Sequence, residues 1–141
     1  MVRKIIKSQD KTSKRIRVPK EERGSSNSEY PSFSFRWYQR GSDVCEGFRK
    51  NTAIGSGVID FLARVSQSTW SEIQTQNHKG YGTEIIEQQA IKAPLPCCVT
   101  PEIKIHVFRV GKKCRLAGFR QQSTFNVLWI DTSPFKLYDH G

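Results

Sequence analysis

The sequence contains no long apolar run. None of its windows approaches the roughly 20 consecutive apolar residues that a membrane-spanning helix needs, so we expect no membrane partner. The basic start of the chain holds only the apolar pair Ile5-Ile6, and we expect no secretory signal there. The four cysteines lack metal-ligand spacing, because Cys97 and Cys98 are adjacent rather than separated as in C-x-x-C, and no pair of histidines flanks them. We therefore expect no metal, no cofactor, and the free thiols of a cytoplasmic protein.

Acidic residues are also scarce. The chain of 141 residues has 13 Asp and Glu against 23 Lys and Arg, which gives a formal net charge of +10. Such an excess predicts affinity for polyanions, with nucleic acid first and an anionic membrane surface or an acidic protein second. A basic protein that has no polyanionic partner is the alternative.

The excess charge is concentrated at the start of the chain. Residues 1–30 carry nine Lys and Arg and four acids, with few large apolar side chains. This composition predicts a flexible basic arm. Two roles remain open for it, a grip on phosphates or on a partner and a purely solubilising tail. Residues 31–141 contain the tryptophans and most other aromatics, and we expect them to form one domain with its own core.

The end of the chain predicts a β-meander. Three apolar runs, Ile103–Val110, Cys114–Arg120 and Thr124–Ile130, are separated by the short polar breaks Gly111-Lys112-Lys113 and Gln121-Gln122-Ser123. Runs of this length with such breaks are typical of antiparallel strands joined by tight hairpins.

The middle of the chain predicts one strand followed by two helices. Aromatic residues alternate through Pro31–Arg40, which indicates a strand with Phe33, Phe35 and Trp37 on one side. Gly55–Gln67 predicts a helix, because its apolar residues recur at helical spacing. That stripe consists of Val58, Phe61, Leu62 and Val65.

A second, short helix is predicted at Trp70–Gln76. Thr69 and Glu72 have the spacing of a capping box, and Trp70 and Ile73 would point inward. Glu84–Ala90 fits either a helical turn or an extended link. The prolines around Cys97-Cys98 indicate an irregular connector into the meander.

These elements predict an α+β fold. Because helices separate the first strand from the meander, that strand most simply joins the meander edge. The expected result is a four-stranded, mainly antiparallel sheet with helices on one face. Strand alternation places Phe125, Val127 and Trp129 on one face, and it places Arg115 and Arg120 on opposite faces unless a bulge at Gly118 shifts the register.

The charged groups of this sheet suggest RNA chemistry. Cleavage of RNA through its own 2′-hydroxyl needs a base, a cation for the phosphate and an acid for the leaving oxygen, and no metal. We predict Arg115 and Arg120 as the candidate phosphate-binding cations, with one of them rather than necessarily both working beside Tyr138 and His140 as the proton-transfer groups. The alternative is that the arginines are solubilising surface residues and that the tail is frayed.

Further basic residues are predicted to bind nucleic acid. They are His78, Lys79, Arg109, Lys112 and Lys113. For the first two, a helix C-terminus with a favourable nearby cation is the competing interpretation.

The stretch RLAGFRQQSTFNVLWIDTSPFKLYDHG resembles the ends of bacterial toxins of the RelE/ParE superfamily. The upstream TWSEI and GTEII are also similar to these proteins, so that the resemblance covers residues 31–141. It implies a toxin of a type II toxin–antitoxin system, held inactive by a cognate antitoxin. RelE-like members cleave mRNA without metal, commonly at the ribosome, through Arg, Lys, His and Tyr side chains; by position these are Arg115, Arg120, Tyr138 and His140 here.

Two non-enzymatic alternatives stand beside this expectation. ParE-like members of the same superfamily inhibit DNA gyrase and do not cleave RNA. A basic accessory protein that binds nucleic acid through its arm is the other. The chain differs from the family in its longer N-terminal arm, its longer connector around Cys97-Cys98, and the Asp139 inserted in the Tyr–His tail.

Overall fold

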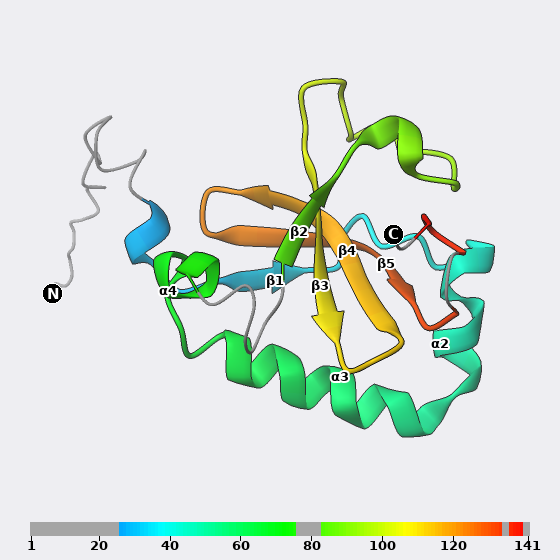
Figure 1. Ribbon diagram of the computed structural model, residues 1–141, viewed down its shortest axis with the longest axis horizontal. Helices are drawn as coiled ribbons and strands as arrows, with labels where there is room; N and C mark the ends of the chain where they lie inside the picture. The colour runs from blue at the N-terminus through cyan, green and yellow to red at the C-terminus, as the bar shows by residue number, and fades with distance from the viewer. Residues whose placement is uncertain (1–25, 76–82, 134–135, 140–141) are drawn as a thin grey trace, which may run out of the picture.

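A computed structural model describes residues 26–75, 83–133 and 136–139. These residues form an α+β fold with one five-stranded mixed sheet (Figure 1). Short 3-10 turns are labelled η. The elements are η1 Ser26–Ser28, β1 Ser32–Ser34, η2 Asp43–Cys45, α2 Glu46–Lys50, α3 Thr52–Val65, α4 Trp70–Thr75, β2 Thr83–Ile86, η3 Gln88–Ala90, β3 Ile105–Val110, β4 Cys114–Gln121 and β5 Thr124–Asp131.

The strands lie in the order β1-β5-β4-β3-β2. Strands β3, β4 and β5 form the predicted antiparallel meander, and β1 joins its edge as expected. The direction of β1, which was not predicted, is parallel to β5. The predicted number of four strands is wrong, because β2 adds a fifth strand antiparallel to β3. This strand has only four residues, too few for an alternation signal, so the sequence left it open between a helical turn and a link.

Strand β1 is much shorter than the predicted Pro31–Arg40. Only residues 32–34 pair with β5, after which the amide of Tyr38 donates to the carbonyl of Phe35 at 3.1 Å and the chain turns. Phe33 packs edge-on against Phe108 and Phe125, whereas Phe35 is 45% exposed. The aromatic alternation therefore continues in sequence beyond the point where the strand has a partner.

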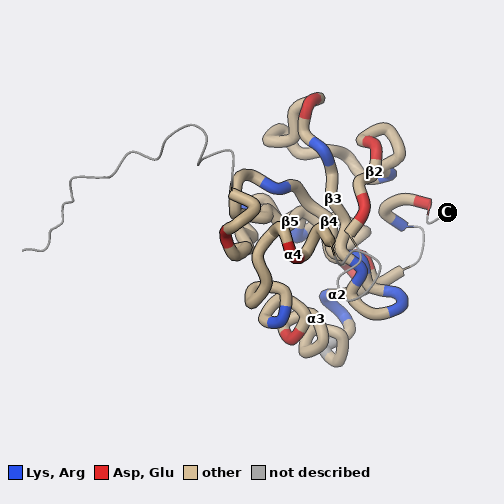
Figure 2. The backbone as a smooth tube through the Cα atoms, turned by 60° about the vertical axis from the view of Figure 1, so that its left-hand side comes forward, with Lys and Arg blue, Asp and Glu red and all other residues tan. Residues whose placement is uncertain are grey.

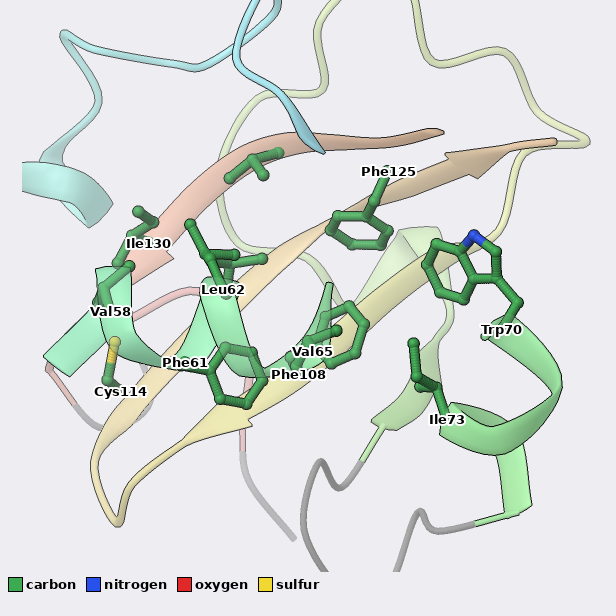
Figure 3. Packing of buried hydrophobic residues seen from close by; sticks show 12 residues of the cluster. Val58, Phe61, Leu62, Val65, Trp70, Ile73, Phe108, Cys114, Phe125 and Ile130 are labelled. Atoms are coloured by element: carbon green, nitrogen blue, oxygen red, sulfur yellow. The ribbon is translucent and has the colours of Figure 1, made fainter. Parts of the chain in front are cut away.

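Helices α3 and α4 cover one face of the sheet (Figure 3). The predicted stripe of α3 is buried in full, although the helix begins at Thr52, earlier than expected. The capping box of α4 is confirmed, since the amide of Glu72 donates to Thr69 Oγ1 at 3.2 Å and the amide of Thr69 to Glu72 Oε1 at 2.9 Å. Trp70 and Ile73 are buried as predicted.

The opposite face is covered by segments without long helices. They come from η2, the connector and the C-terminal tail, whose Leu137 is fully buried. Asp131, itself buried, holds this tail: its Oδ1 accepts from the amide of Ser133 at 2.9 Å and its Oδ2 from the amide of Leu137 at 3.0 Å. The sheet thus has a packed core on both faces.

A bulge in β5 changes which residues share a face. Ala117 pairs with Trp129 and Gly118 with Val127, so Leu128 is the extra residue. Trp129 therefore packs on the tail-covered face, and its predicted position beside Phe125 and Val127 is wrong. A bulge depends on contacts between strands, which periodicity within one strand does not report.

The pairing of β3 with β4 is regular throughout. Arg115 and Arg120 accordingly lie on opposite faces of the sheet, as the alternation within β4 predicts. This separation divides the predicted catalytic set into two places.

The β4–β5 turn contains a residue in a strained conformation. Gln122 has φ 58°, a region where L-residues other than Gly, Asn and Asp are disfavoured. We expect Gln122→Gly to raise the free energy of unfolding by about 0.5–1 kcal/mol, measured by urea denaturation. A decrease would show that the glutamine side chain stabilises the turn by more than the backbone strain costs.

None of the helices among the described residues combines the length and the apolar character that crossing a bilayer would require.

Candidate functional site

A pocket of about 320 Å³ opens on the helix-covered face, between α4, the edge strand β2 and the centre of the sheet. Trp70, Phe108 and Phe125 supply apolar lining, with ring centroids 5.2 to 6.4 Å apart. His106 from β3 and Arg120 from β4 also line it. Glu84 of β2 lines it as well. The pocket therefore joins an aromatic surface to one imidazole, one guanidinium and one carboxylate residue.

The sheet register brings the two polar groups together. His106 lies opposite Gly118 across the β3–β4 pair, and Arg120 follows two residues later on the same face. Because Gly118 has no side chain, nothing on β4 stands between the imidazole and Arg120. The proximity is reflected in the pKa of His106, which the charge of Arg120 helps to lower.

Arg120 is held in place by neutral groups. Its Nη2 donates to Ser26 Oγ at 2.9 Å and to Asn27 Oδ1 at 2.7 Å, and its Nε donates to the carbonyl of Gln122 at 2.6 Å. The guanidinium carbon lies 4.3 Å from the ring centroid of Trp70, a cation–π contact.

No carboxylate lies within ion-pair distance of Arg120 among residues 26–75, 83–133 and 136–139. Burial lowers its pKa, but an arginine starts so high that it stays charged at neutral pH. The result is a positioned positive charge that has no ion-pair partner among the described residues, although the charge of Glu29 is near enough to oppose the lowering of its pKa. Such a guanidinium suits an oxyanion.

His106 is a neutral imidazole at pH 7. Burial lowers its pKa below the ordinary 6.5, and the positive charges of Arg120 and Lys104 lower it further. A neutral imidazole can accept a proton, as a general base must.

Arg115 and Tyr138 lie on the other face of the sheet. The hydroxyl of Tyr138 donates to Glu84 Oε2 at 2.8 Å, and burial together with this carboxylate raises the pKa of Tyr138 to about 12. Arg115 is close enough for its charge to oppose that rise, while its Nη1 donates to the carbonyls of Lys112 at 3.2 Å and Cys114 at 3.1 Å. A tyrosine that holds its proton this firmly is a poor base at neutral pH.

The remaining predicted residues separate into two groups. Arg109, Lys112 and Lys113 are exposed on the β3–β4 hairpin, away from the pocket. His78, Lys79 and His140 lie outside the described residues.

Lys and Arg occur on many parts of the described chain, interspersed with acids, rather than on one face (Figure 2).

The described residues contain no group of three or more His, Cys, Asp or Glu that could hold a metal ion. All four cysteines are free thiols. Burial and the nearby Asp131 raise the pKa of Cys114 to about 11, so this thiol stays protonated and weakly nucleophilic.

His106 is not among the residues that the sequence predicts for the site. A signal for it was present, because the short break Gly111–Lys113 fixes the pairing of Val110 with Cys114. Counting back along both strands from that pair places His106 opposite Gly118, and hence on the face of Arg120. Alternation within a single strand does not carry this information, which appears only when the register is transferred across the hairpin.

Comparison of the chain with family models, with curated proteins and with solved structures finds no match in any of the three.

Proposed function

We propose that this protein is a metal-independent endoribonuclease that acts at the pocket lined by His106 and Arg120. The observation that carries the proposal is their presence in one pocket, a neutral imidazole beside a positioned guanidinium without an ion-pair partner. They supply two of the three groups that cleavage through the 2′-hydroxyl requires, the base and the cation.

The reaction proceeds as an internal transfer at phosphorus. His106 takes the proton of the 2′-hydroxyl, whose oxygen attacks the adjacent phosphorus as the bond to the 5′ oxygen breaks. The leaving oxygen takes up a proton from solvent, His106 returns its own proton to solvent, and the products are a 2′,3′-cyclic phosphate and a 5′-hydroxyl. Arg120 binds the phosphate oxygens and stabilises the negative charge that grows on them. The apolar lining around Trp70 and Phe108 receives a nucleobase.

The charge distribution supports RNA as the substrate. The basic residues of the N-terminal segment join the described fold at Ser26, which contacts Arg120 directly. A basic segment attached beside the pocket would add phosphate contacts along the RNA on either side of the cleaved bond.

A toxin of a type II toxin–antitoxin system is the cellular role that fits this activity. Its support is the resemblance of residues 31–141 to RelE/ParE-like toxins and the order strand, helices and meander expected of them. In this proposal the protein acts in the cytoplasm on RNA, free or on the ribosome, and a cognate antitoxin holds it inactive. Induced expression in bacteria should arrest growth, and co-expression of the neighbouring open reading frame should restore it.

A non-catalytic role is favoured by one separate observation. Arg109, Lys112 and Lys113 form an exposed basic hairpin outside the pocket, a surface suited to binding an acidic partner or nucleic acid without chemistry. In this second candidate function the protein is a ParE-like gyrase inhibitor that binds through this hairpin. Inhibition of supercoiling by the purified protein, with RNA left intact, would select this role over the nuclease.

The pH dependence of cleavage follows from the pKa of His106. Protonation inactivates a general base, so kcat/KM should fall as pH drops through a midpoint below 6.5, and the profile should be flat from pH 7 to 8. Lys104→Gln removes one of the charges that lower this pKa and should move the midpoint upward. A midpoint above pH 7 would exclude His106 as the base.

A further inference from the structure

A second pocket, of about 620 Å³, lies on the tail-covered side of the sheet. Residues 38–44, after β1, form one wall, and Lys92 to Pro94 of the connector form another. Lys136 of the C-terminal tail and Trp129 of β5 complete it. Figure 1 shows the red C-terminal segment beside the cyan segment that follows β1. The lining of this second pocket shares no residue with the lining of the His106–Arg120 pocket.

The charges around this pocket are mostly positive. Arg40, Lys92 and Lys136 line it, against the single acid Asp43. Lys92 Nζ is paired with Asp139 Oδ1 at 2.6 Å, whereas Arg40 and Lys136 are exposed cations that line the pocket from separate segments. Two cations facing one space from separate segments favour an anion between them.

Trp129 supplies the second, independent observation. Its side chain is fully buried and lines the pocket, and its Nε1–H has no hydrogen-bond acceptor among the residues that the structure describes. An indole N–H only donates, and buried donors are nearly always paired. The indole is closed to solvent in the free chain, so a ligand oxygen would give this donor a partner once the side chains that cover it move aside.

We propose that this second pocket binds a phosphate monoester, with Arg40 and Lys136 contacting the phosphate and Trp129 Nε1–H donating to a ligand oxygen. The cavity volume falls within the range of small-molecule sites and accommodates a mononucleotide. The side chain of Tyr38, half-buried at the wall, offers an aromatic edge to the base. This site is independent of the proposed nuclease pocket.

The test is calorimetric titration of the full chain with inorganic phosphate and with AMP. We expect AMP to bind, and the double variant Arg40→Glu/Lys136→Glu to weaken its affinity at least tenfold. The matched control is Arg64→Glu/Lys104→Glu, which makes the same change in net charge at residues that do not line the pocket, and its affinity should stay within twofold. Trp129→Phe, which removes the donor and keeps an aromatic ring, should weaken AMP binding about fivefold with circular dichroism unchanged.

The phosphate monoester has two sources, a free nucleotide and the 5′ end of an RNA. Short RNAs with a 5′-phosphate or a 5′-hydroxyl distinguish them. Preference for the phosphorylated RNA without binding of AMP would support the site and identify the RNA end as its ligand. The proposal is overturned if Arg40→Glu/Lys136→Glu and the control bind inorganic phosphate, AMP and 5′-phosphorylated RNA equally well, or if the wild-type chain binds none of them. His106→Ala should leave the affinity for AMP and for 5′-phosphorylated RNA unchanged. A failure of the nuclease proposal can therefore be told apart from a failure of this binding site.

Discussion

His106→Ala is expected to lower the rate of RNA cleavage by about two to four orders of magnitude, the range that a positioned general base contributes. The reason is geometric, since His106 is the imidazole that the β3–β4 register places beside Arg120. The measurement is single-turnover cleavage of a short RNA in EDTA, with and without ribosomes. His106→Gln should be equally inactive, because an amide cannot take the 2′ proton.

Arg120→Ala should reduce cleavage by about two to three orders of magnitude, the effect of removing one group that stabilises an oxyanion. This side chain also connects η1 to the sheet through Ser26 and Asn27, so the variant needs a thermal unfolding control. Arg120→Lys keeps the charge but loses the planar fork, and its residual activity should lie between those of the wild type and Arg120→Ala.

Tyr138→Phe is the matched control for the other face of the sheet. It removes only the hydroxyl that donates to Glu84, and we expect cleavage to remain within about threefold of the wild-type rate. Strong loss of activity in Tyr138→Phe, with His106→Ala unaffected, would move the active site to Arg115 and the tail. Unchanged cleavage in both His106→Ala and Arg120→Ala would refute the proposed site.

The parts of the fold that the sequence predicted are those with local causes. The stripe of α3 repeats at helical spacing, and the capping box of α4 needs only Thr69 and Glu72 three residues apart, so both signals are complete within one segment. The meander is local in the same sense, because each hairpin joins strands that are neighbours in the sequence.

The parts that sequence reasoning missed depend on contacts between segments. Strand β2 exists because the edge of β3 accepts it, and the end of β1 is set by where β5 offers partners. The bulge at Leu128 moved Trp129 to the other face, where its side chain is among the residues that line the second pocket. Neither the bulge nor the face on which Trp129 lies can be read from the alternation of Phe125, Val127 and Trp129 alone.

The candidate site also combines features with local causes and features that depend on contacts between distant segments. Arg120 was predicted from its residue type and its strand, which are local properties. Its stacking on Trp70 and its bonds to η1 join residues far apart in the sequence, and no spacing rule connects them. His106 required one more step, the transfer of register across the hairpin, which the length of the break at Gly111–Lys113 permits.

Gly118→Ala is expected to be the most destabilising of the small substitutions in the sheet. A Cβ at this position would overlap the backbone carbonyl oxygen of Asn126 and press on the ring of Phe125. A backbone carbonyl within a strand pair cannot rotate away, so β4 and β5 must separate next to the bulge. We expect a loss of about 3 kcal/mol in the free energy of unfolding, at the upper end of the usual cost of overpacking.

The matched control is Gly57→Ala in α3, where an added Cβ meets nothing within 4 Å. That variant should gain about 0.5–1 kcal/mol, because alanine replaces glycine inside a helix. Urea denaturation of both variants measures the contrast, and a Gly118→Ala protein as stable as the wild type would contradict the close β4–β5 approach. Since Gly118 lies between His106 and Arg120, any separation of β4 also displaces Arg120, and cleavage by Gly118→Ala should fall even at temperatures where the variant remains folded.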